Sequence, residues 1–196
     1  MDFTKYLESY MERAGRTLNQ TPFEQLKQAA EMLMEARAKG NWIFSAGNGG
    51  SAATASHFAN DFVKGLSVEG HKRFKTMSLN DGIPIVTALG NDYDYSRCYS
   101  EQLKNYGAPG DILVVYSGSG NSPNVVKAAE YARSIGMKVI SFTGRDGGKL
   151  DEYSDIDCIA PTDCMEEIED VHMVWEHALV MGLREMILSE EEKAGA

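Results

Sequence analysis

The chain begins with segments whose apolar residues recur every three or four positions. Residues 2–18 carry apolar side chains at positions 3, 6, 7, 10, 11 and 14, a spacing that predicts an amphipathic helix. The following sequence, Thr21-Pro22-Phe23-Glu24, predicts the start of a second helix with Thr21 as its N-cap and Glu24 closing a capping box. This helix should end near residue 38, before Gly40. We therefore expect an N-terminal helical arm over about residues 2–38.

Short continuous apolar runs follow the arm and alternate with helical segments. The runs predict strands, and the most apolar, 111–116, is typical of a parallel strand buried on both faces. Helices are predicted near Ser51 and at 83–89, 93–106 and 123–135, and a long one runs from Met165 to about 192. The strands are expected at 42–45, 75–79, 111–116, 137–142 and 157–159. This alternation predicts an α/β three-layer sandwich, with a central parallel sheet covered by helices on both faces. We expect residues 1–196 to form a single domain.

Composition narrows the classes of protein that fit this pattern. The chain has 196 residues, 43% hydrophobic content and a net charge of −10. The negative charge argues against a nucleic-acid partner or an anionic membrane surface. No apolar run approaches the roughly 18 residues of a membrane span. Cys98, Cys158 and Cys164 lack CxxC or zinc-finger spacing, so we interpret them as reduced thiols of a cytoplasmic protein.

Three strands end in loops rich in glycine, serine or asparagine, at 45–51, 117–122 and 143–148. Loops at the carboxyl ends of parallel strands gather at one edge of the sheet, where ligands bind. The middle loop combines the hydroxyls of Ser117, Ser119 and Ser122 with the N-terminus of the next helix, which suits a phosphate group. Neither GxGxxG nor Walker spacing occurs in these loops. The loops therefore favour a phosphorylated small molecule over a dinucleotide.

Two predicted helices carry polar side chains that could meet. His57 and Asp61 are four residues apart and share one helix face. Glu169 and His177, on the last helix, are eight apart, about 80° round the axis. A His-Asp-Glu-His set suits zinc or a similar divalent metal. The alternative is that these residues lie on solvated helix faces, and His172 fits better as a core or interface histidine.

Several stretches together resemble a known family. AGNGGSAATASHFANDF, YSGSGNSPNVVKAAEYAR, ISFTGRDGGKL and EEIEDVHMVWEHAL are similar to sequences of the sugar isomerase (SIS) domain family, and more narrowly to its phosphoheptose isomerase type. The resemblance covers roughly residues 20–190. It implies the SIS fold and aldose–ketose isomerisation of a sugar phosphate, from sedoheptulose 7-phosphate to heptose 7-phosphate through an enediol. It also implies a homotetramer with active sites at subunit contacts.

The resemblance assigns roles to individual positions. Asp61 would be the catalytic base and His177 its acid–base partner. His57, Asp61, Glu169 and His177 would hold zinc in those members that bind it. The substrate-binding positions would be Asn48, Gly49, Gly50, Ser51, Asp81, Ser117, Gly118, Ser119, Ser122 and Glu169. Asp81 fits only when one extra residue is allowed before Asn91-Asp92.

The sequence departs from the family at two of these positions. Asp61 stands where the family has glutamate, one methylene longer, and Glu169 stands where it has glutamine. Two alternatives therefore stay open beside the isomerase. One is a non-catalytic SIS protein that binds a replication initiator. The other is an SIS isomerase or sensor for a different sugar phosphate.

Overall fold

The computed structural model describes residues 1–194, and the side chains of residues 1–190. Five strands form one sheet in the order β2-β1-β3-β4-β5, and every neighbouring pair is parallel. The strands are β1 (Trp42–Gly47), β2 (Lys75–Ser78), β3 (Ile112–Ser117), β4 (Lys138–Gly144) and β5 (Ile156–Ala160). Each overlaps a predicted strand, so the α/β prediction with a central parallel sheet is confirmed.

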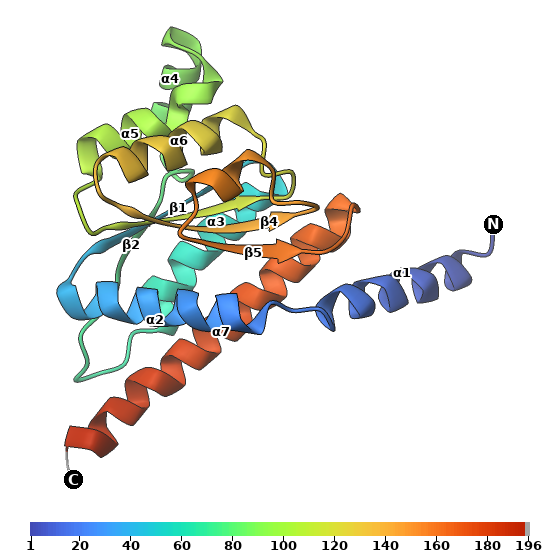
Figure 1. The fold of residues 1–196 in the computed structure, drawn as a ribbon, viewed down its shortest axis with the longest axis horizontal. Helices are drawn as coiled ribbons and strands as arrows, with labels where there is room; N and C mark the ends of the chain where they lie inside the picture. The colour runs from blue at the N-terminus through green and yellow to red at the C-terminus, as the bar shows by residue number, and fades with distance from the viewer. Residues whose placement is uncertain (195–196) are drawn as a thin grey trace.

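Helices cover both faces of this sheet (Figure 1). They are α1 (Phe3–Leu18), α2 (Phe23–Lys39), α3 (Gly50–Asn60), α4 (Ile83–Asp92), α5 (Cys98–Tyr106), α6 (Pro123–Ser134) and α7 (Met165–Ala194). One core is formed by side chains of α2, α3 and α7 against the sheet, and the other by α5 and α6. The three-layer architecture is therefore confirmed. None of the helices in the described part of the chain is long and apolar enough to span a membrane.

The order of the strands determines where a ligand can bind. β1 and β3 are neighbours in the sheet, but α3 follows β1 on one face while α6 follows β3 on the other. The connections thus diverge between β1 and β3, and the loops after them leave a crevice at the carboxyl ends of the strands. These are the loops that the sequence singled out at 45–51 and 117–122.

The starts of two helices differ from the predictions. Thr21 does not cap α2: its hydroxyl donates to the Leu18 carbonyl oxygen at 2.6 Å and accepts from Trp175 Nε1 at 2.9 Å. The capping box is therefore wrong, because Thr21 joins the α1–α2 turn to α7. The helix predicted at 93–106 begins only at Cys98, after a 3₁₀ turn (Tyr95–Arg97) in which the Ser96 amide donates to Asp94 Oδ1 at 2.8 Å.

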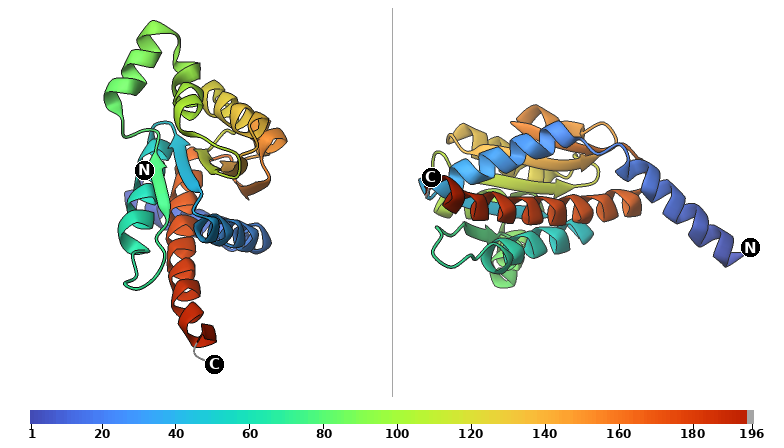
Figure 2. Two further views of the ribbon diagram at one scale, coloured as in Figure 1. Left: turned by 90° about the vertical axis from the view of Figure 1, so that its left-hand side faces the viewer. Right: turned by 90° about the horizontal axis from the view of Figure 1, so that it is seen from below.

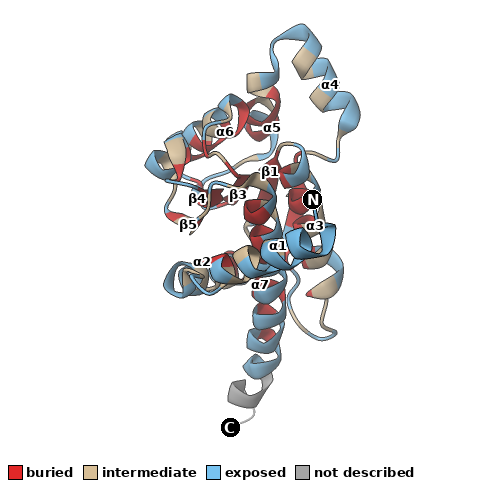
Figure 3. Ribbon diagram, turned by 90° about the vertical axis from the view of Figure 1, so that its right-hand side faces the viewer, coloured by how far each residue is buried: buried red, intermediate tan, exposed pale blue. Residues whose placement is uncertain are grey.

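The two N-terminal helices behave differently. α2 packs against α7 and β5, whereas α1 extends away from the body of the molecule (Figure 1). Figure 2 shows that α7 also runs beyond the sheet at its far end. Exposed residues dominate α1 and α4 (Figure 3), and α4 has no buried residue at all. The sheet, α3 and the first half of α7 are therefore the rigid frame for a site.

Candidate functional site

A pocket of about 300 Å³ lies at the crevice between β1 and β3. Its walls come from the loops after these two strands and from the start of α7. The lining includes all but one of the positions to which the family resemblance assigns substrate contact: Asn48, Gly49, Gly50, Ser51, Ser117, Gly118, Ser119, Ser122 and Glu169. The structure therefore brings together nine residues that lie as much as 121 positions apart in the chain (169 − 48).

Asparagine side chains hold the first loop in place. Asn80 accepts from the Gly47 amide at 3.2 Å and donates to the Gly47 carbonyl at 2.8 Å. Asn48 and Asn124 exchange two side-chain hydrogen bonds of 2.8 Å, and the Tyr95 hydroxyl donates to Asn48 at 2.9 Å. Sequence reasoning missed the positioning role of these residues, although Asn80 directly follows the strand predicted at 75–79 and Asn124 lies in the first turn of the helix predicted at 123–135.

The segment after β4 donates hydrogen bonds to the serine-rich second loop. The Leu150 amide donates to the Gly120 carbonyl at 3.0 Å, and the Lys149 amide donates to Asn121 Oδ1 at 3.2 Å. The loop at 143–148 does not line the pocket, so the expectation that three loops share the ligand is wrong for this one. Ser122 occupies the N-cap position of α6 without its side chain capping the helix. The hydroxyls and helix N-terminus thus form a neutral cradle suited to a phosphate.

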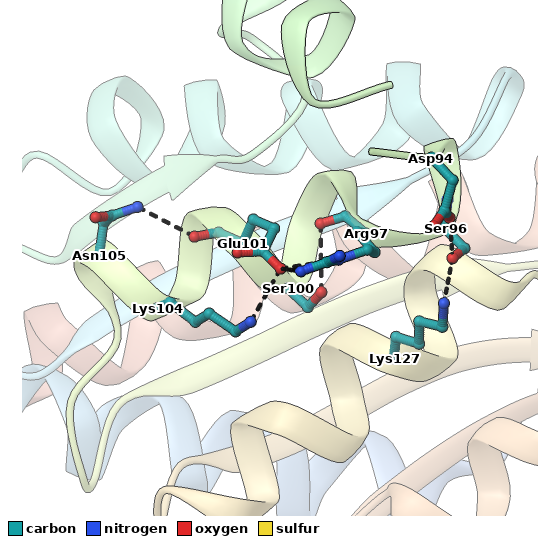
Figure 4. Close-up of polar contacts among 8 residues, drawn as sticks. All are labelled: Asp94, Ser96, Arg97, Ser100, Glu101, Lys104, Asn105 and Lys127. Atoms are coloured by element: carbon teal, nitrogen blue, oxygen red, sulfur yellow. Dashed lines mark hydrogen bonds and ion pairs between the residues drawn. The ribbon is translucent and has the colours of Figure 1, made fainter. Parts of the chain in front are cut away.

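A second, more charged cleft is lined by residues of α5 and α6, and Figure 4 shows the polar contacts of its charged side chains. It contains three cations, but Glu101 Oε1 accepts from Arg97 at 2.6 Å and from Lys104 at 2.9 Å. Lys127 donates to the Ser96 hydroxyl. Because its own carboxylate already pairs with two of the cations, this cleft is less suited to a phosphate than the neutral cradle.

Four ionisable side chains meet where α3 packs against α7. His57 and His177 face each other with their Nε2 atoms 3.0 Å apart. Asp61 Oδ2 lies 3.4 Å from His57 Nε2, and Glu176 Oε2 lies 3.6 Å from His177 Nε2. One ligand atom from each of the four lies within 4.8 Å of the others. The sequence thus correctly paired the two helices and three of these residues.

Local helix geometry helps to assemble this cluster. Asp61 begins a π-helical turn, Asp61–Gly65, in which the Leu66 amide bonds to the Asp61 carbonyl at 3.0 Å. Such turns insert one residue into a helix and often occur at functional sites. The widened turn continues α3 directly, so His57 and Asp61 remain on adjoining turns that face α7.

The fourth member of the cluster is Glu176, not Glu169. Glu176 is fully buried, and neither carboxylate oxygen has a hydrogen-bond partner among the described residues. Burial, with the nearby Asp61 charge, raises the pKa of Glu176 to about 8. Glu169 instead covers Gly50 in the pocket: a Cβ placed on Gly50 would lie 2.2 Å from Glu169 Oε2. The resemblance-based metal set of His57, Asp61, Glu169 and His177 is therefore not the set that the structure brings together.

Asp81 and His172, the two other residues considered from the sequence, lie outside the pocket and the cluster. Asp81 lies outside the pocket lining and is exposed, with its carboxylate accepting from Ser56 Oγ at 2.5 Å. His172 is buried, with Nε2 2.9 Å from the Thr143 carbonyl oxygen. Burial lowers the pKa of His172 to about 4. The interpretation of His172 as a core histidine is confirmed.

The donor set of the cluster is compatible with a divalent cation. Two imidazole nitrogens and carboxylate oxygens are the ligands that zinc and similar metals take in proteins. An unpartnered buried carboxylate is costly, and a cation would satisfy Glu176. The residues present therefore fit the metal that the family resemblance implies.

Comparison with known proteins matches this architecture to one family. The model of the SIS domain matches residues 3–144. A phosphoheptose isomerase of Bordetella avium is 38% identical over 98% of this chain and 100% of its own, and one of Helicobacter pylori is 40% identical over 80% and 81%. The structure of a phosphoheptose isomerase from Francisella tularensis, 30% identical, superposes with a TM-score of 0.87 over 94% of this chain and 100% of its own.

A parallel five-stranded sheet with a serine-rich loop at its switch point defines the class: the chain belongs to the SIS domain family. Within that family, its full-length similarity is to enzymes named phosphoheptose isomerase. This places the chain among aldose–ketose isomerases.

Proposed function

We propose that the chain converts sedoheptulose 7-phosphate to heptose 7-phosphate. The observation that carries this proposal is that the helix α3 contributes to two separate regions. These are the pocket beside the serine loop and the cluster of ionisable side chains. Gly50, at the start of α3, lines the pocket beside the serine loop, and His57 lies seven residues further, about 10 Å along the axis. A seven-carbon sugar carries its phosphate at the end opposite the reacting carbons, so it needs two such separated regions.

In this proposal the pocket binds the phosphate and the sugar hydroxyls. Ser117, Gly118, Ser119 and Ser122 would hold the phosphate through hydroxyl and amide hydrogen bonds. Asn48, Gly49, Gly50, Ser51 and Glu169 would contact the sugar, and Asp81 would contact it from outside the pocket lining. The lack of lysine or arginine in the lining suits a protein of net charge −10 that binds an anion through dipoles.

The chemistry is a proton transfer between neighbouring carbons. The Asp61 carboxylate removes a proton from C1 of the ketose while His177 gives a proton to the C2 carbonyl oxygen, which forms the 1,2-enediol. Return of a proton to C2, with loss of the hydroxyl proton on O1, yields the aldose. The same two residues can serve both halves, so no net proton is consumed. A bound divalent cation would supply polarisation of the carbonyl oxygen.

Three finer proposals accompany this function. Zinc or a similar metal would be held at the cluster that contains His57, Asp61 and His177. The chain would assemble as a homotetramer with active sites at subunit interfaces, consistent with the exposed apolar residues of α1 and α7. The single-domain organisation and the cytoplasmic location stay predictions, which limited proteolysis and cell fractionation would test.

The activity is tested by incubating purified protein with sedoheptulose 7-phosphate and following the aldose product by NMR. We expect turnover by the wild type and a loss of at least a hundredfold in kcat for His177→Gln. Ser119→Ala should mainly raise KM. Glu130→Gln is the matched control and should behave as wild type, because Glu130 is an exposed residue of α6 that does not line the pocket.

No turnover of this substrate, with or without added zinc, would overturn the proposed reaction. Turnover of a different sugar phosphate under the same conditions would favour the alternative substrate class. The initiator-binding alternative has no support in the structure, since a binding module does not require the four clustered ionisable side chains.

A further inference from the structure

Glu176 is a buried carboxylate to which neither the sequence pattern nor the family resemblance assigns a role. We propose that Glu176 supplies the fourth protein ligand of the divalent-cation site formed with His57, Asp61 and His177. Glu169, the position carried over from the family, then belongs to the substrate pocket alone. This inference rests on the proposed metal site, and it changes which residues build that site.

The surroundings of Glu176 indicate a missing partner. Its side chain is fully buried, and both oxygens lack a hydrogen bond within the described residues. The His177 imidazole lies beside it, with Nε2 3.6 Å from Glu176 Oε2. A buried carboxylate with both oxygens unsatisfied is strongly unfavourable, so the site needs a group that interacts with this carboxylate. A cation shared with the two facing imidazoles is such a group.

The packing of the two helices explains why Glu176 and not Glu169 reaches the cluster. Gly50 on α3 lies against Glu169 on α7. His57 is seven residues after Gly50, and Glu176 is seven residues after Glu169. Seven residues make nearly two full turns and a rise of about 10 Å. On each helix, the residue at the pocket and the residue at the cluster are therefore separated by the same distance. Glu169 lies about two helical turns before Glu176 on α7, at the level of the pocket and not of the cluster.

The α3 side of the cluster is complete even though Asp61 is short. Aspartate is one methylene shorter than the glutamate that the resemblance places at this position, and its carboxylate still lies 3.4 Å from His57 Nε2. Glu176 offers a carboxylate oxygen from α7, as Glu169 does in the set that the resemblance implies, so the types of donor are unchanged. The set is two imidazoles and two carboxylates, with one ligand atom of each within 4.8 Å of the others, which suits a divalent cation.

The test compares two isosteric substitutions on the same helix, Glu176→Gln and Glu169→Gln. Each full-length protein is stripped with EDTA and dialysed, and zinc binding is measured by isothermal titration calorimetry. Cobalt(II) is then added separately, and its visible absorption reports the ligand field. We expect Glu176→Gln to weaken zinc binding at least tenfold and to change the cobalt spectrum, while Glu169→Gln changes zinc affinity less than twofold.

Two results would overturn the proposal while leaving the metal site intact: zinc affinity unchanged in Glu176→Gln, or affinity lost only in Glu169→Gln. A wild type that binds neither metal would overturn the metal site and the role of Glu176 together, while the NMR assay would still decide the isomerase activity independently. If Glu176→Gln does not fold, Glu176→Leu replaces it. We expect the metal-free Leu variant to melt higher than wild type and to lose the zinc-induced increase in Tm; a retained increase would contradict the proposal.

Discussion

At the scale of single residues, Asp157 shows how burial alters a carboxyl group away from the candidate site. It lies on the edge strand β5, where both of its oxygens interact with Thr143 Oγ1, at 2.8 and 2.9 Å. Partial burial raises the pKa of Asp157 to about 6, and the hydrogen bonds only partly oppose this effect. The folded protein therefore binds a proton at Asp157 more tightly than the unfolded chain does.

This pKa shift predicts that Asp157→Asn stabilises the protein at neutral pH. A raised folded-state pKa makes the wild type lose stability as pH rises from about 4 through about 6. The neutral amide can keep hydrogen bonds to Thr143 and removes this loss. We expect the variant to gain about 1–3 kcal/mol over wild type at pH 7.5 and little at pH 4, measured by urea denaturation. Asp163→Asn, at an exposed position, is the control; an equal gain at both pH values would contradict the argument.

The residue scale also shows the limit of prediction from sequence. His57, Asp61 and His177 could be found from helix spacing and family resemblance, because each depends on a local pattern. Glu176 could not, since the start of α7 contains several acidic residues and only packing against α3 determines which of them is buried. The hydrogen-bonding roles of Asn80 and Asn124 were likewise invisible, because they depend on contacts with Gly47 and Asn48 from other elements.

At the scale of elements, the candidate phosphate cradle depends on a close approach of two backbone loops. Gly120 has a φ of 62°, and a Cβ at this position would lie 1.9 Å from the Gly147 carbonyl oxygen. A Cβ on Gly148 would lie 2.5 Å from the Ser119 carbonyl oxygen. The loop after β4 therefore fixes the conformation of the serine loop after β3, even though it does not line the pocket.

Gly120→Ala should disrupt this arrangement. The methyl group clashes with backbone atoms, which cannot rotate away as a side chain can. We expect a loss of about 2–4 kcal/mol in the free energy of unfolding and weaker binding of inorganic phosphate, measured by chemical denaturation and calorimetry. Gly70→Ala is the matched control, because Gly70 has a φ of 82° with open space around it. Equal losses in both variants would mean that backbone conformation alone, and not the contact with Gly147, is responsible.

Elements themselves were more predictable than their ends. All five strands could be located, and β1, β3 and β4 stood out as apolar runs because buried parallel strands need continuous apolar side chains. The start of α2 was misplaced because Thr21 bonds to Trp175, a contact over 154 positions. Similarly, the helix predicted at 83–89 is longer than expected, since α4 continues to Asp92. The π turn at Asp61–Gly65 has no local sequence signal and arises where α3 continues against α7.

At the scale of the whole molecule, apolar side chains remain exposed on several helices. α1 exposes Phe3, Tyr6, Leu7 and Met11, although Arg13 ties it to Glu167 on α7 at 2.8 Å. A groove of about 490 Å³ between α2 and α7 is lined mainly by apolar side chains. Surfaces of this kind mark interfaces between proteins, and they support the proposed tetramer.

The tetramer predicts that charge placed on the exposed face of α7 will separate the subunits. Val174 and Met181 are 46% and 61% exposed, so glutamate at both positions should leave the folded chain intact. In an interface, however, two buried carboxylates would be strongly unfavourable. We expect wild type to sediment as a tetramer and Val174→Glu/Met181→Glu as a monomer or dimer in analytical ultracentrifugation, with unchanged circular dichroism. Glu130→Gln should stay tetrameric. A monomeric wild type, or a double variant that stays tetrameric, would contradict the assembly; a dissociated variant that keeps full activity would show that each site is complete within one chain.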